Sequence, residues 1–438
     1  MSASQGPTAD TSPGATSARR LALEVTRQIR RRGAYAHELI ESQVRSARLP
    51  LAERNFAIVL ILGVVACQGE LDYLLDSALV TGSIKSDVRD ALRISTYEMV
   101  FLHKEIPVVV DQGVELVRSF APYASGFANK ILRQVAKLKE DFPFGDVTCD
   151  VEALAHQQAF PGWFAKRLIA EFGFASATAF MEASNQQAPV FLADIARGTT
   201  VEVAAADFSA WLPRIEAGEF IVADASAQKV AALATPSAGG DFLEVGSGRG
   251  TKTVLLYHNA RRARDLDGPP ARIYALDRHA FKQTILQERI KRYHLEDVIP
   301  VVGDALRLDE LVSARLISQD FGGALIDAPC SGTGTLRRHP EIRWRLTPED
   351  VTAMAAQGLA MLQAVARHIK PGGFVVYSTC SALREENEQV IDAFLASDDG
   401  EPFVLDPSTI PPNPFRSTLT PTSPDAHFAA KLRRQPRP

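Results

Sequence analysis

The sequence has few cysteines, and none of its apolar runs is long enough to cross a membrane. Only four of the 438 residues are cysteine, and they form no CxxC pair and have no histidine at zinc-site spacing. The sequence therefore predicts neither a disulfide framework nor a metal site. The longest apolar run, residues 56–67, is shorter than the roughly 18 residues of a membrane span and indicates a buried core helix. Free thiols point to a reducing, cytoplasmic compartment.

A strong excess of one charge is also missing. The net charge is −4, and contents of 46% apolar and 23% charged residues are ordinary for a globular protein. Because the surface is not basic overall, any nucleic-acid site must come from a local patch. Residues 1–18 are small and polar, lack the apolar segment of a signal peptide, and predict a disordered tail. No feature indicates an oligomer, so a monomer is expected.

Residues 19–143 predict an all-helical domain. Leu21, Val25 and Ile29 form an apolar stripe in a first helix over residues 19–46. Further helices, separated by glycine or proline, are expected at 51–67, 71–79, 86–102, 108–120 and 126–138. The first stripe is surrounded by six arginines: Arg19, Arg20, Arg27, Arg30, Arg31 and Arg32. These arginines either contact RNA phosphates or form an ordinary solvated face, and both alternatives are open.

The remaining chain predicts a small mixed subdomain and then a doubly wound α/β domain. A linker over residues 141–150 precedes the subdomain at 150–217, in which a helix near 163–171 and a strand near 190–194 are expected. From residue 218 onward strands and helices alternate, which predicts a parallel sheet with crossover helices. The expected strands are 241–245, 272–277, 298–302, 323–326 and 374–377. A helix over 348–370 is expected, with Thr347 as N-cap and Asp350 completing a capping box.

A glycine-rich loop follows the first strand of this sheet and opens a helix. Such loops bind NAD, flavin or S-adenosylmethionine, whereas a Walker A loop for ATP has a longer glycine spacing. The expected cofactor contacts in the loop are Glu244, Gly246, Ser247, Gly248, Arg249, Gly250, Thr251 and Lys252. Asp277, Asp304 and Asp327 follow three other strands. Each alone is compatible with an ordinary cap or loop residue, but together they favour a nucleoside ligand, with ribose on Asp277 and adenine near Asp304.

Two cysteines lie where parallel strands end. Cys330 belongs to Asp327-Ala-Pro-Cys330, and Cys380 belongs to Thr379-Cys380-Ser381. A thiolate suits covalent catalysis at a pyrimidine, because attack on C6 of cytosine makes C5 nucleophilic enough to accept a methyl group. Such chemistry needs a nucleophilic cysteine, a carboxylate near the N3/N4 edge, and help with release of the thiol. Asp327, Cys330 and Cys380 are the candidate catalytic residues, whereas Cys67 and Cys149 are assigned to packing.

The helical region and the cysteine motifs both resemble known families. Residues 54–65, 92–120 and 125–135 (RNFAIVLILGVV, LRISTYEMVFLHKEIPVVVDQGVELVRSF and SGFANKILRQV) resemble the RNA-binding domain of the antitermination factor NusB. DAPCSGTGTLRRHPEIRW with YSTCS resembles the RNA cytosine-C5 methyltransferases of the ribosomal small-subunit type, which carry an N-terminal NusB-like domain. Residues 218–228, 384–394 and 423–432 fit the same family. The resemblance covers nearly the whole chain after the tail.

The resemblance implies a function and residue roles. It implies an S-adenosylmethionine-dependent enzyme that forms 5-methylcytosine in small-subunit ribosomal RNA, with domains at 19–143, 150–217 and 218–438. It implies Cys380 as the covalent nucleophile and Cys330 as the thiol that assists release. It further implies that Asp327 contacts cofactor and cytosine, and that Asp277 and Asp304 contact the cofactor. The target base must be single-stranded or flipped out for a thiol to reach C6.

The chain departs from the family at two places. The usual Asp-x-Cys-Ala-Ala-Pro-Gly-Gly-Lys-Thr cofactor loop is replaced by residues 244–253, EVGSGRGTKT. The subdomain segment 188–200 lacks the usual Leu-Arg-Val-Asn after Ala-Pro, with Arg197 as a substitute. Three alternatives stay open: the same enzyme acting on transfer RNA, an RNA-binding ribosome assembly factor that has lost cofactor binding, and an NAD-linked dehydrogenase. The last leaves both thiols unexplained.

A basic segment follows the Cys330 loop. It contains Arg337, Arg338, His339, Arg343 and Arg345, with Trp344 among them. Basic side chains beside an aromatic ring suit phosphate contact and base stacking in single-stranded RNA. The alternative is a solvated loop in which Trp344 belongs to a hydrophobic core.

Overall fold

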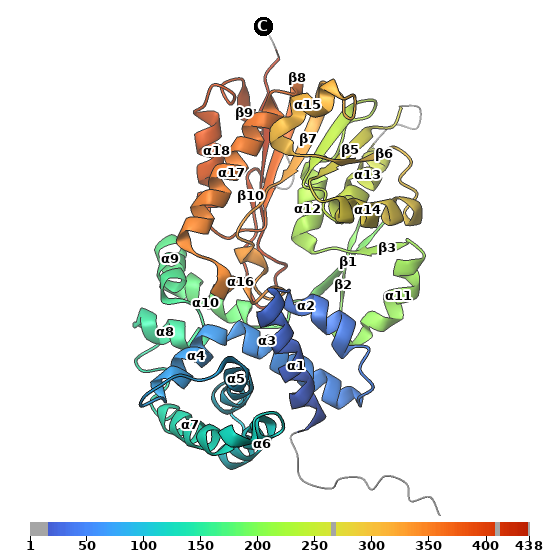
Figure 1. Ribbon diagram of the computed structural model, residues 1–438. Helices are drawn as coiled ribbons and strands as arrows, with labels where there is room; N and C mark the ends of the chain where they lie inside the picture. The colour runs from blue at the N-terminus through green and yellow to red at the C-terminus, as the bar shows by residue number, and fades with distance from the viewer. Residues whose placement is uncertain (1–15, 264–268, 408–411, 437–438) are drawn as a thin grey trace, which may run out of the picture. The chain divides into compact units, whose positions relative to one another are not determined.

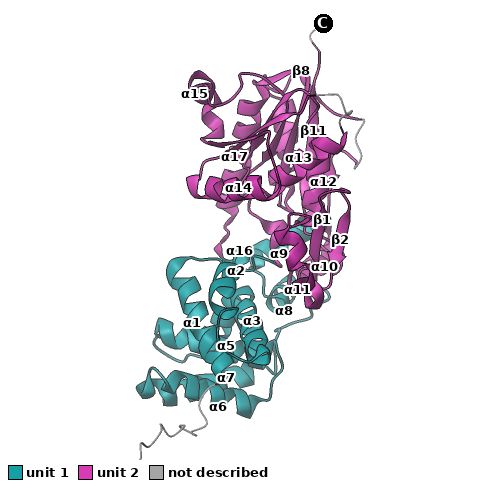
Figure 2. Ribbon diagram, turned by 90° about the vertical axis from the view of Figure 1, so that its right-hand side faces the viewer, with its two compact units in different colours: residues 1–170, 338–344 teal, residues 171–337, 345–438 magenta. Residues whose placement is uncertain are grey.

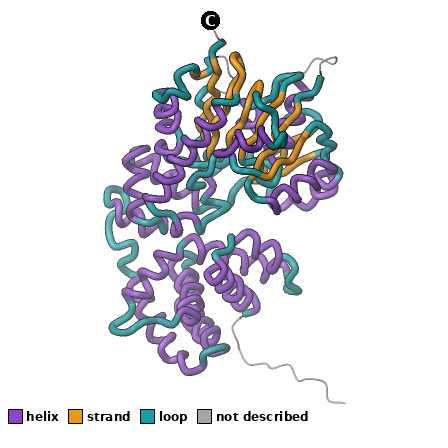
Figure 3. The backbone as a smooth tube through the Cα atoms, turned by 45° about the horizontal axis from the view of Figure 1, so that its top comes forward, coloured by secondary structure: helices purple, strands orange, loops and turns teal. Residues whose placement is uncertain are grey.

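The computed structural model describes residues 16–263, 269–407 and 412–436, which divide into two compact units. Unit 1 comprises residues 1–170 and 338–344, and unit 2 comprises residues 171–337 and 345–438 (Figure 2). All strands of the described chain lie in unit 2, as the colouring of Figure 3 shows. Most of the predicted tail lies outside the described residues, but Ser17 and Ala18 already belong to the first helix.

Unit 1 is helical. Its helices are α1 (Ser17–Arg32), α2 (Ala36–Leu39), α3 (Leu51–Ala66), α4 (Gln68–Ser77), α5 (Ser86–Val100), α6 (Ile106–Arg118), α7 (Ser125–Leu138), α8 (Val151–Gln158) and the start of α9 (Gly162–Phe172) (Figure 1). The single helix predicted over 19–46 is wrong, because Gly33 adopts a left-handed conformation (φ 63°) that ends α1. The apolar run 56–67 lies in α3, where Leu60 and Ile61 are fully buried.

No single helix among the described residues is long and apolar enough to cross a membrane. Helices α3 and α4 meet that length and composition only when taken together, and they are bent by 75° at their junction.

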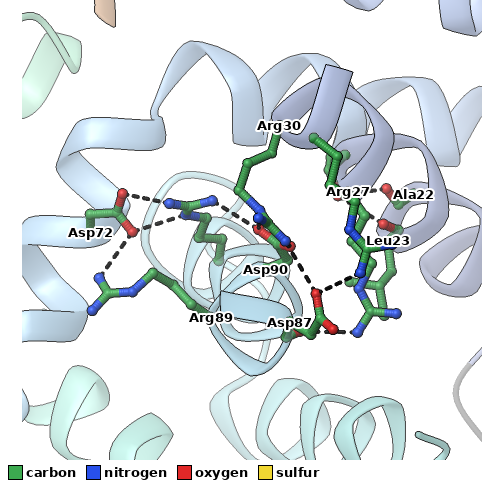
Figure 4. A network of polar contacts seen from close by, with 11 residues as sticks. Ala22, Leu23, Arg27, Arg30, Asp72, Asp87, Arg89 and Asp90 are labelled. Atoms are coloured by element: carbon green, nitrogen blue, oxygen red, sulfur yellow. Dashed lines mark hydrogen bonds and ion pairs between the residues drawn. The ribbon is translucent and has the colours of Figure 1, made fainter. Parts of the chain in front are cut away.

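The arginines of α1 are largely paired inside unit 1. Arg19 and Glu98 form a buried ion pair of 2.7 Å. Arg30 contacts Asp90 at 2.8 Å and Asp87 at 3.1 Å, and Figure 4 shows these two carboxylates of α5 beside α1. Other arginines of α1 with partners in unit 1 are Arg27, over the Phe120 ring at 4.0 Å, and Arg31, 3.0 Å from Asp87. This pairing favours a structural role for these four side chains over contact with RNA phosphates.

The segment after the Cys330 loop belongs to the core of unit 1. Trp344, in α16 (Ile342–Arg345), donates from its indole nitrogen to the carbonyl of Ala66 at 2.7 Å. Arg343 is fully buried, lies 4.3 Å from the Phe160 ring and donates to the carbonyl of Ala159 at 3.3 Å. Burial lowers the pKa of Arg343 to about 10. The prediction that Arg343 contacts RNA is therefore wrong, and Trp344 occupies the core position that was the alternative.

Docking of Trp344 makes a prediction about Gly69 in α4. A Cβ atom at Gly69 would lie 2.2 Å from Cζ3 of Trp344, so Gly69→Ala must displace the indole ring. We expect the variant to lose about 1–3 kcal/mol of unfolding free energy, the usual cost of overpacking a core, measured by urea denaturation of the full chain.

Gly126→Ala in α7 is the matched control. Nothing lies within 4 Å of a Cβ at this position, which is also near a helix N-terminus. Alanine favours helix over glycine, so this variant is expected to be neutral or slightly stabilised. Equal effects of the two substitutions would contradict the docking of Trp344 against α4.

Unit 2 contains a doubly wound sheet with the strand order β10-β11-β8-β7-β4-β5-β6, and β9 pairs with β11. Strands β4 to β8 are parallel, and β11 is antiparallel to β8. The strands are β4 (Asp241–Val245), β5 (Arg272–Asp277), β6 (Val298–Val302), β7 (Phe321–Asp327), β8 (Ile369–Thr379), β9 (Phe403–Leu405), β10 (Phe415–Arg416) and β11 (Phe428–Arg434). The predictions for the first three strands are confirmed to the residue, and β7 and β8 are longer than predicted.

Helices cover both faces of this sheet. They are α12 (Ala225–Leu233), α13 (Thr251–Ala263), α14 (Ala280–Arg292), α15 (Leu308–Ser313), α17 (Pro348–Ala366) and α18 (Glu388–Leu395). Successive strand residues point to opposite faces, so Leu243 joins the core under α17 and α18, whereas Phe242 joins the core with α12 to α14. Thr347 and Asp350 form the predicted capping box. Helix α17 ends before the predicted Lys370 because Ile369 pairs with Phe321 of β7.

A second, smaller sheet precedes the large one in unit 2. Its strands are β1 (Val190–Asp194), β2 (Thr200–Val203) and β3 (Phe220–Val222), in the antiparallel order β2-β1-β3. Helices α10 (Phe174–Ser184) and α11 (Phe208–Glu216) accompany it. The predicted strand at 190–194 and the predicted helix near 163–171 are both confirmed.

Candidate active site

The strand order creates one switch point in the large sheet. The chain passes from β4 to β5 and β6 on one side, then returns to β7 on the other side of β4. Loops that leave β4 and β7 therefore diverge, and ligands of open α/β sheets bind in that crevice at the carboxyl ends of the strands. Gly246, after β4, has φ 78°, and a Cβ there would lie 2.5 Å from the carbonyl oxygen of Asp327. The glycine lets the two loops touch.

The glycine-rich loop is tied to the end of β5. The carboxylate of Asp277 accepts hydrogen bonds from the backbone amides of Gly248 at 3.0 Å and His279 at 2.8 Å. The amides of Gly246 and Ser247 donate to the carbonyl of Leu276 at 2.9 and 3.0 Å. The loop therefore has a fixed path despite its unusual sequence.

Two of the predicted cofactor contacts have their carboxylates engaged elsewhere. Glu244 is 1% exposed and accepts a hydrogen bond of 2.6 Å from the hydroxyl of Thr253, so it supports the first turn of α13 from below. Asp304 is exposed and caps a short helix by accepting from the amide of Leu306 at 2.9 Å. Asp304 thus has the role of an ordinary cap residue, which was one of its two interpretations.

Burial of Glu244 makes a prediction about pH. Burial raises the pKa of Glu244 from 4.5 to about 7, so between these values the folded protein keeps a proton that the unfolded chain loses. The free energy of unfolding therefore falls as pH rises through this window, by about 3 kcal/mol at 1.36 kcal/mol per pKa unit. Glu244→Gln is expected to remove this loss, so that its melting temperature exceeds that of the wild type at pH 8 but not at pH 4.5.

Glu310→Gln, at an exposed carboxylate of α15, serves as the control for this measurement and should follow the wild type at both pH values. Parallel pH curves for Glu244→Gln and wild type would show that Glu244 ionises normally in the folded protein.

Lys252 and Asp327 form an ion pair at the switch point. Lys252, in the first turn of α13, donates to Asp327 at 2.7 Å, and its side chain is 14% exposed. Burial disfavours the ammonium group, but the charges of Asp327, Cys380 and Glu244 outweigh burial and raise the pKa of Lys252. Lys252 therefore stays positively charged beside Asp327 and Cys380.

The two cysteines of the motifs come together. The sulfur atoms of Cys330 and Cys380 are 3.4 Å apart, and both cysteines are free thiols. The hydrogen bond to Cys380, together with burial, raises the pKa of Cys330 well above its usual value. Cys330 is therefore the partner that keeps its proton, and its S–H group can donate to the sulfur of Cys380. Lys252 supplies a positive charge near Cys380, so the pair is electrostatically asymmetric.

Glu386 holds the two cysteine loops together and was missed by sequence reasoning. Its buried carboxylate accepts from the amide of Ser331 at 2.6 Å, from the hydroxyl of Ser331 at 2.5 Å, and from the hydroxyl of Ser381. These serines directly follow Cys330 and Cys380. Burial raises the pKa of Glu386. Its segment, REENE, was interpreted only as the start of a helix, and a run of charged residues gives no signal that one carboxylate is buried.

His427 was also missed. It is 6% exposed and lies just before β11. Burial and the charge of Lys252 lower its pKa, while Asp224, Asp425 and Asp327 oppose that shift. A neutral imidazole therefore lies near the Lys252–Asp327 pair. The sequence signal was a histidine at the start of a predicted strand, which more often indicates packing.

Comparison with protein families decides which enzymes share this arrangement. The family model described as 16S rRNA methyltransferase RsmB/F matches residues 231–433, and the NusB family model matches residues 16–137. The catalytic domain belongs to the RsmB/F methyltransferase family. The predicted resemblance is thereby confirmed, and so is the predicted order of a NusB-type helical domain followed by a Rossmann-like domain.

Relatives from three bacteria match over most of their length. The chain is 29% identical over 422 residues to "Probable ribosomal RNA small subunit methyltransferase B" of Synechocystis sp., covering 88% of this chain and 91% of that protein. It is 28% identical over 413 residues to the protein of the same name in Bacillus subtilis, covering 87% and 88%. It is 28% identical over 416 residues to ribosomal RNA small subunit methyltransferase B of Sodalis glossinidius, covering 87% and 90%.

Solved structures show the same fold. The crystal structure of PH0851 superimposes with a TM-score of 0.74 at 20% identity, covering 95% of this chain and 98% of that one. A methyltransferase homologue from Pyrococcus horikoshii superimposes with a TM-score of 0.51 at 21% identity, covering 64% and 97%. At these identities the likeness concerns the fold alone.

RsmB/F enzymes are S-adenosylmethionine-dependent, and the residues at the switch point fit that cofactor. The cofactor carries a positive sulfonium and two ribose hydroxyls, which suit carboxylate acceptors such as Asp277 and Asp327. A Cβ at Gly248 would meet nothing closer than 3.8 Å, so the outer side of the loop is open. The replaced loop therefore keeps a path that admits the cofactor. Individual contacts by residues 246–252 and by Asp304 stay predictions.

Proposed function

We propose that the protein methylates C5 of a cytosine in small-subunit ribosomal RNA through a covalent bond between Cys380 and C6. The observation that supports this most is the asymmetric pair of thiols, 3.4 Å apart, beside the Lys252–Asp327 ion pair. Neither hydride transfer nor RNA binding alone has a use for two adjacent thiols at the ends of β7 and β8. The names of the bacterial relatives support ribosomal RNA as the substrate.

Each catalytic side chain has a role that its surroundings allow. Lys252 favours the thiolate form of Cys380, which attacks C6 to form a carbon–sulfur bond. The electron pair of the C5–C6 double bond shifts into the ring, and C5 becomes nucleophilic. Asp327, held by Lys252, contacts the N3/N4 edge and orients the base. The cofactor supplies the electrophilic methyl group that C5 takes up.

Release reverses the first step. When C5 loses its proton, the C6–S electron pair leaves with sulfur, and the C5–C6 double bond forms again. The protonated thiol of Cys330 lies beside the departing sulfur and can donate a hydrogen bond to it, which favours the thiolate as a leaving group. Its raised pKa keeps Cys330 protonated for this role.

The direct test is the position of the transferred methyl group. Deproteinised small-subunit RNA is incubated with the protein and methyl-tritiated S-adenosylmethionine, digested to nucleosides and separated by chromatography. The proposal predicts label in 5-methylcytidine. Label only in transfer RNA offered in parallel, or in another nucleoside, would overturn the substrate or the C5 product, respectively. An RNA-binding assembly factor without cofactor binding predicts no label in any RNA.

A further inference from the structure

A hollow of about 560 Å³ lies in unit 2, away from the cysteines. It is formed by the turn after β1, by the α11–β3 connection and by the last turns of α13, and Figure 1 shows these elements on one side of the large sheet. Its lining residues are Asp194, Ile195, Ala196, Arg197, Arg214, Gly218, Glu219, Phe220, His258, Arg261 and Arg262. None of these residues takes part in the chemistry described above.

The lining is positively charged although the chain as a whole is not. Four arginines face two carboxylates, Asp194 and Glu219, which leaves a net charge of +2 in a chain of net charge −4. His258 adds no charge at neutral pH, because burial lowers its pKa to about 4. The hollow is thus the kind of local basic patch that a nearly neutral protein needs in order to bind a polyanion.

Two of the arginines are fixed in place and build the walls. Arg262 donates to the carbonyl of Ile195 at 2.6 Å, and a Cβ at Gly198 (φ 69°) would come within 2.7 Å of its guanidinium group. Arg214 lies over the Phe220 ring at 4.4 Å and pairs with Glu219 at 2.8 Å. The small sheet and α13 are therefore joined by packed guanidinium groups.

The other two arginines have guanidinium groups to spare. The side chain of Arg197 is 78% exposed, and its contact with Asp194 is long, at 3.3 Å. Arg261 donates one hydrogen bond, to the hydroxyl of Tyr257 at 2.8 Å. A guanidinium group carries five N–H donors in a planar fork that matches a phosphate. Each of these two side chains therefore keeps donors that point to no acid of similar strength.

We propose that this hollow binds backbone phosphates of the substrate RNA, with Arg197 and Arg261 as the contacting residues. The proposal rests on the proposed function and extends it to a second contact region outside the active site. Helix α13 links the two places, because Lys252 is in its first turn and Arg261 in its last. Nine residues of helix span about 14 Å, or roughly four stacked nucleotides at 3.4 Å each. A strand with its cytosine at Cys380 is therefore long enough to reach the hollow.

The test compares the double variant Arg197→Ala/Arg261→Ala with wild type and with Arg367→Ala. Arg367 is an equally basic, 62% exposed arginine that pairs with Asp399. The double variant is expected to raise the KM for RNA about tenfold without changing kcat at saturating RNA or the Kd for cofactor. The slope of log K against log salt in RNA binding should fall by about one to two, since about one phosphate contact is lost per arginine. Arg367→Ala should match the wild type.

Further arms separate the possible outcomes. Glu219→Gln removes a negative charge from the lining and is expected to tighten RNA binding, whereas a merely structural hollow predicts no change. An unchanged KM and salt slope in the double variant would overturn the proposal. So would stabilisation of the wild type, but not of the double variant, by millimolar inorganic pyrophosphate with RNA binding unaffected, because the hollow would then hold small anions. RNA binding is measured by filter retention, so the result stands even if no RNA is methylated and the proposed function fails.

Discussion

Cys380→Ala is expected to abolish methyl transfer, lowering kcat by roughly 10³-fold or more, because the covalent route has no alternative nucleophile at C6. Cofactor binding should persist, since Cys380 lies at the end of β8 and the glycine-rich loop follows β4. Single-turnover transfer of labelled methyl groups and calorimetry with cofactor measure the two quantities separately.

Cys330→Ala is expected to behave differently, which makes it the informative partner. Without the S–H donor 3.4 Å from the Cys380 sulfur, bond formation at C6 remains possible but departure of the thiolate slows. A protein–RNA adduct should therefore accumulate and resist denaturing electrophoresis. Cys149→Ala, at an exposed free thiol of unit 1, is the control and should turn over normally. Adduct accumulation in Cys380→Ala instead would reverse the two assignments.

Glu386→Ala is expected to lower kcat by about 10²-fold, the usual effect of displacing a reacting group by about 1 Å. The substitution leaves the Ser331 amide and the Ser331 and Ser381 hydroxyls without their shared acceptor. Unsatisfied buried groups cost about 1–3 kcal/mol each, so the variant should also melt at a lower temperature. The spacing between Cys330 and Cys380 is then no longer fixed.

Glu386→Gln separates positioning from mere stability. The amide keeps an acceptor for the Ser331 N–H while its NH₂ group faces the serine hydroxyls, which can themselves accept. We expect activity in the order wild type, Gln, Ala, with an unchanged Kd for cofactor in all three. Glu385→Gln, one residue away and bonded to the exposed hydroxyl of Thr352, is the control. A fully active and stable Glu386→Ala would show that the serine network does not position the thiols.

Local signals in the sequence predict most of the catalytic sheet. Strands β4, β5 and β6 are short apolar runs bounded by glycine, proline or charged residues, so their bounds follow from the pattern alone. Motifs at strand ends likewise predict Asp327, Cys330 and Cys380 at one edge, since parallel strands bring their carboxyl ends together. The N-terminal helix was predicted too long because glycine within a helical pattern is ambiguous, and only Gly33's left-handed backbone ends α1.

Contacts between residues far apart in sequence account for the failures. Trp344 bonds to Ala66, 278 residues earlier, and no local pattern distinguishes this core tryptophan from one that stacks on RNA. Arg343 is buried among carbonyl groups and the Phe160 ring, although its basic neighbourhood is typical of a solvated segment. Glu386 is similar, because its burial depends on the serines that follow both cysteines.

Peptide mapping of a trapped adduct tests the central claim most directly. RNA in which cytidine is replaced by 5-fluorocytidine is incubated with the wild-type protein and S-adenosylmethionine. Fluorine at C5 cannot leave as a proton does, so the bond to C6 persists after methyl transfer. The account predicts a one-to-one protein–RNA adduct whose modified peptide, identified by mass spectrometry, carries the nucleotide on Cys380. Attachment at Cys330, or methylation of natural RNA without any adduct to the fluorinated RNA, would contradict it.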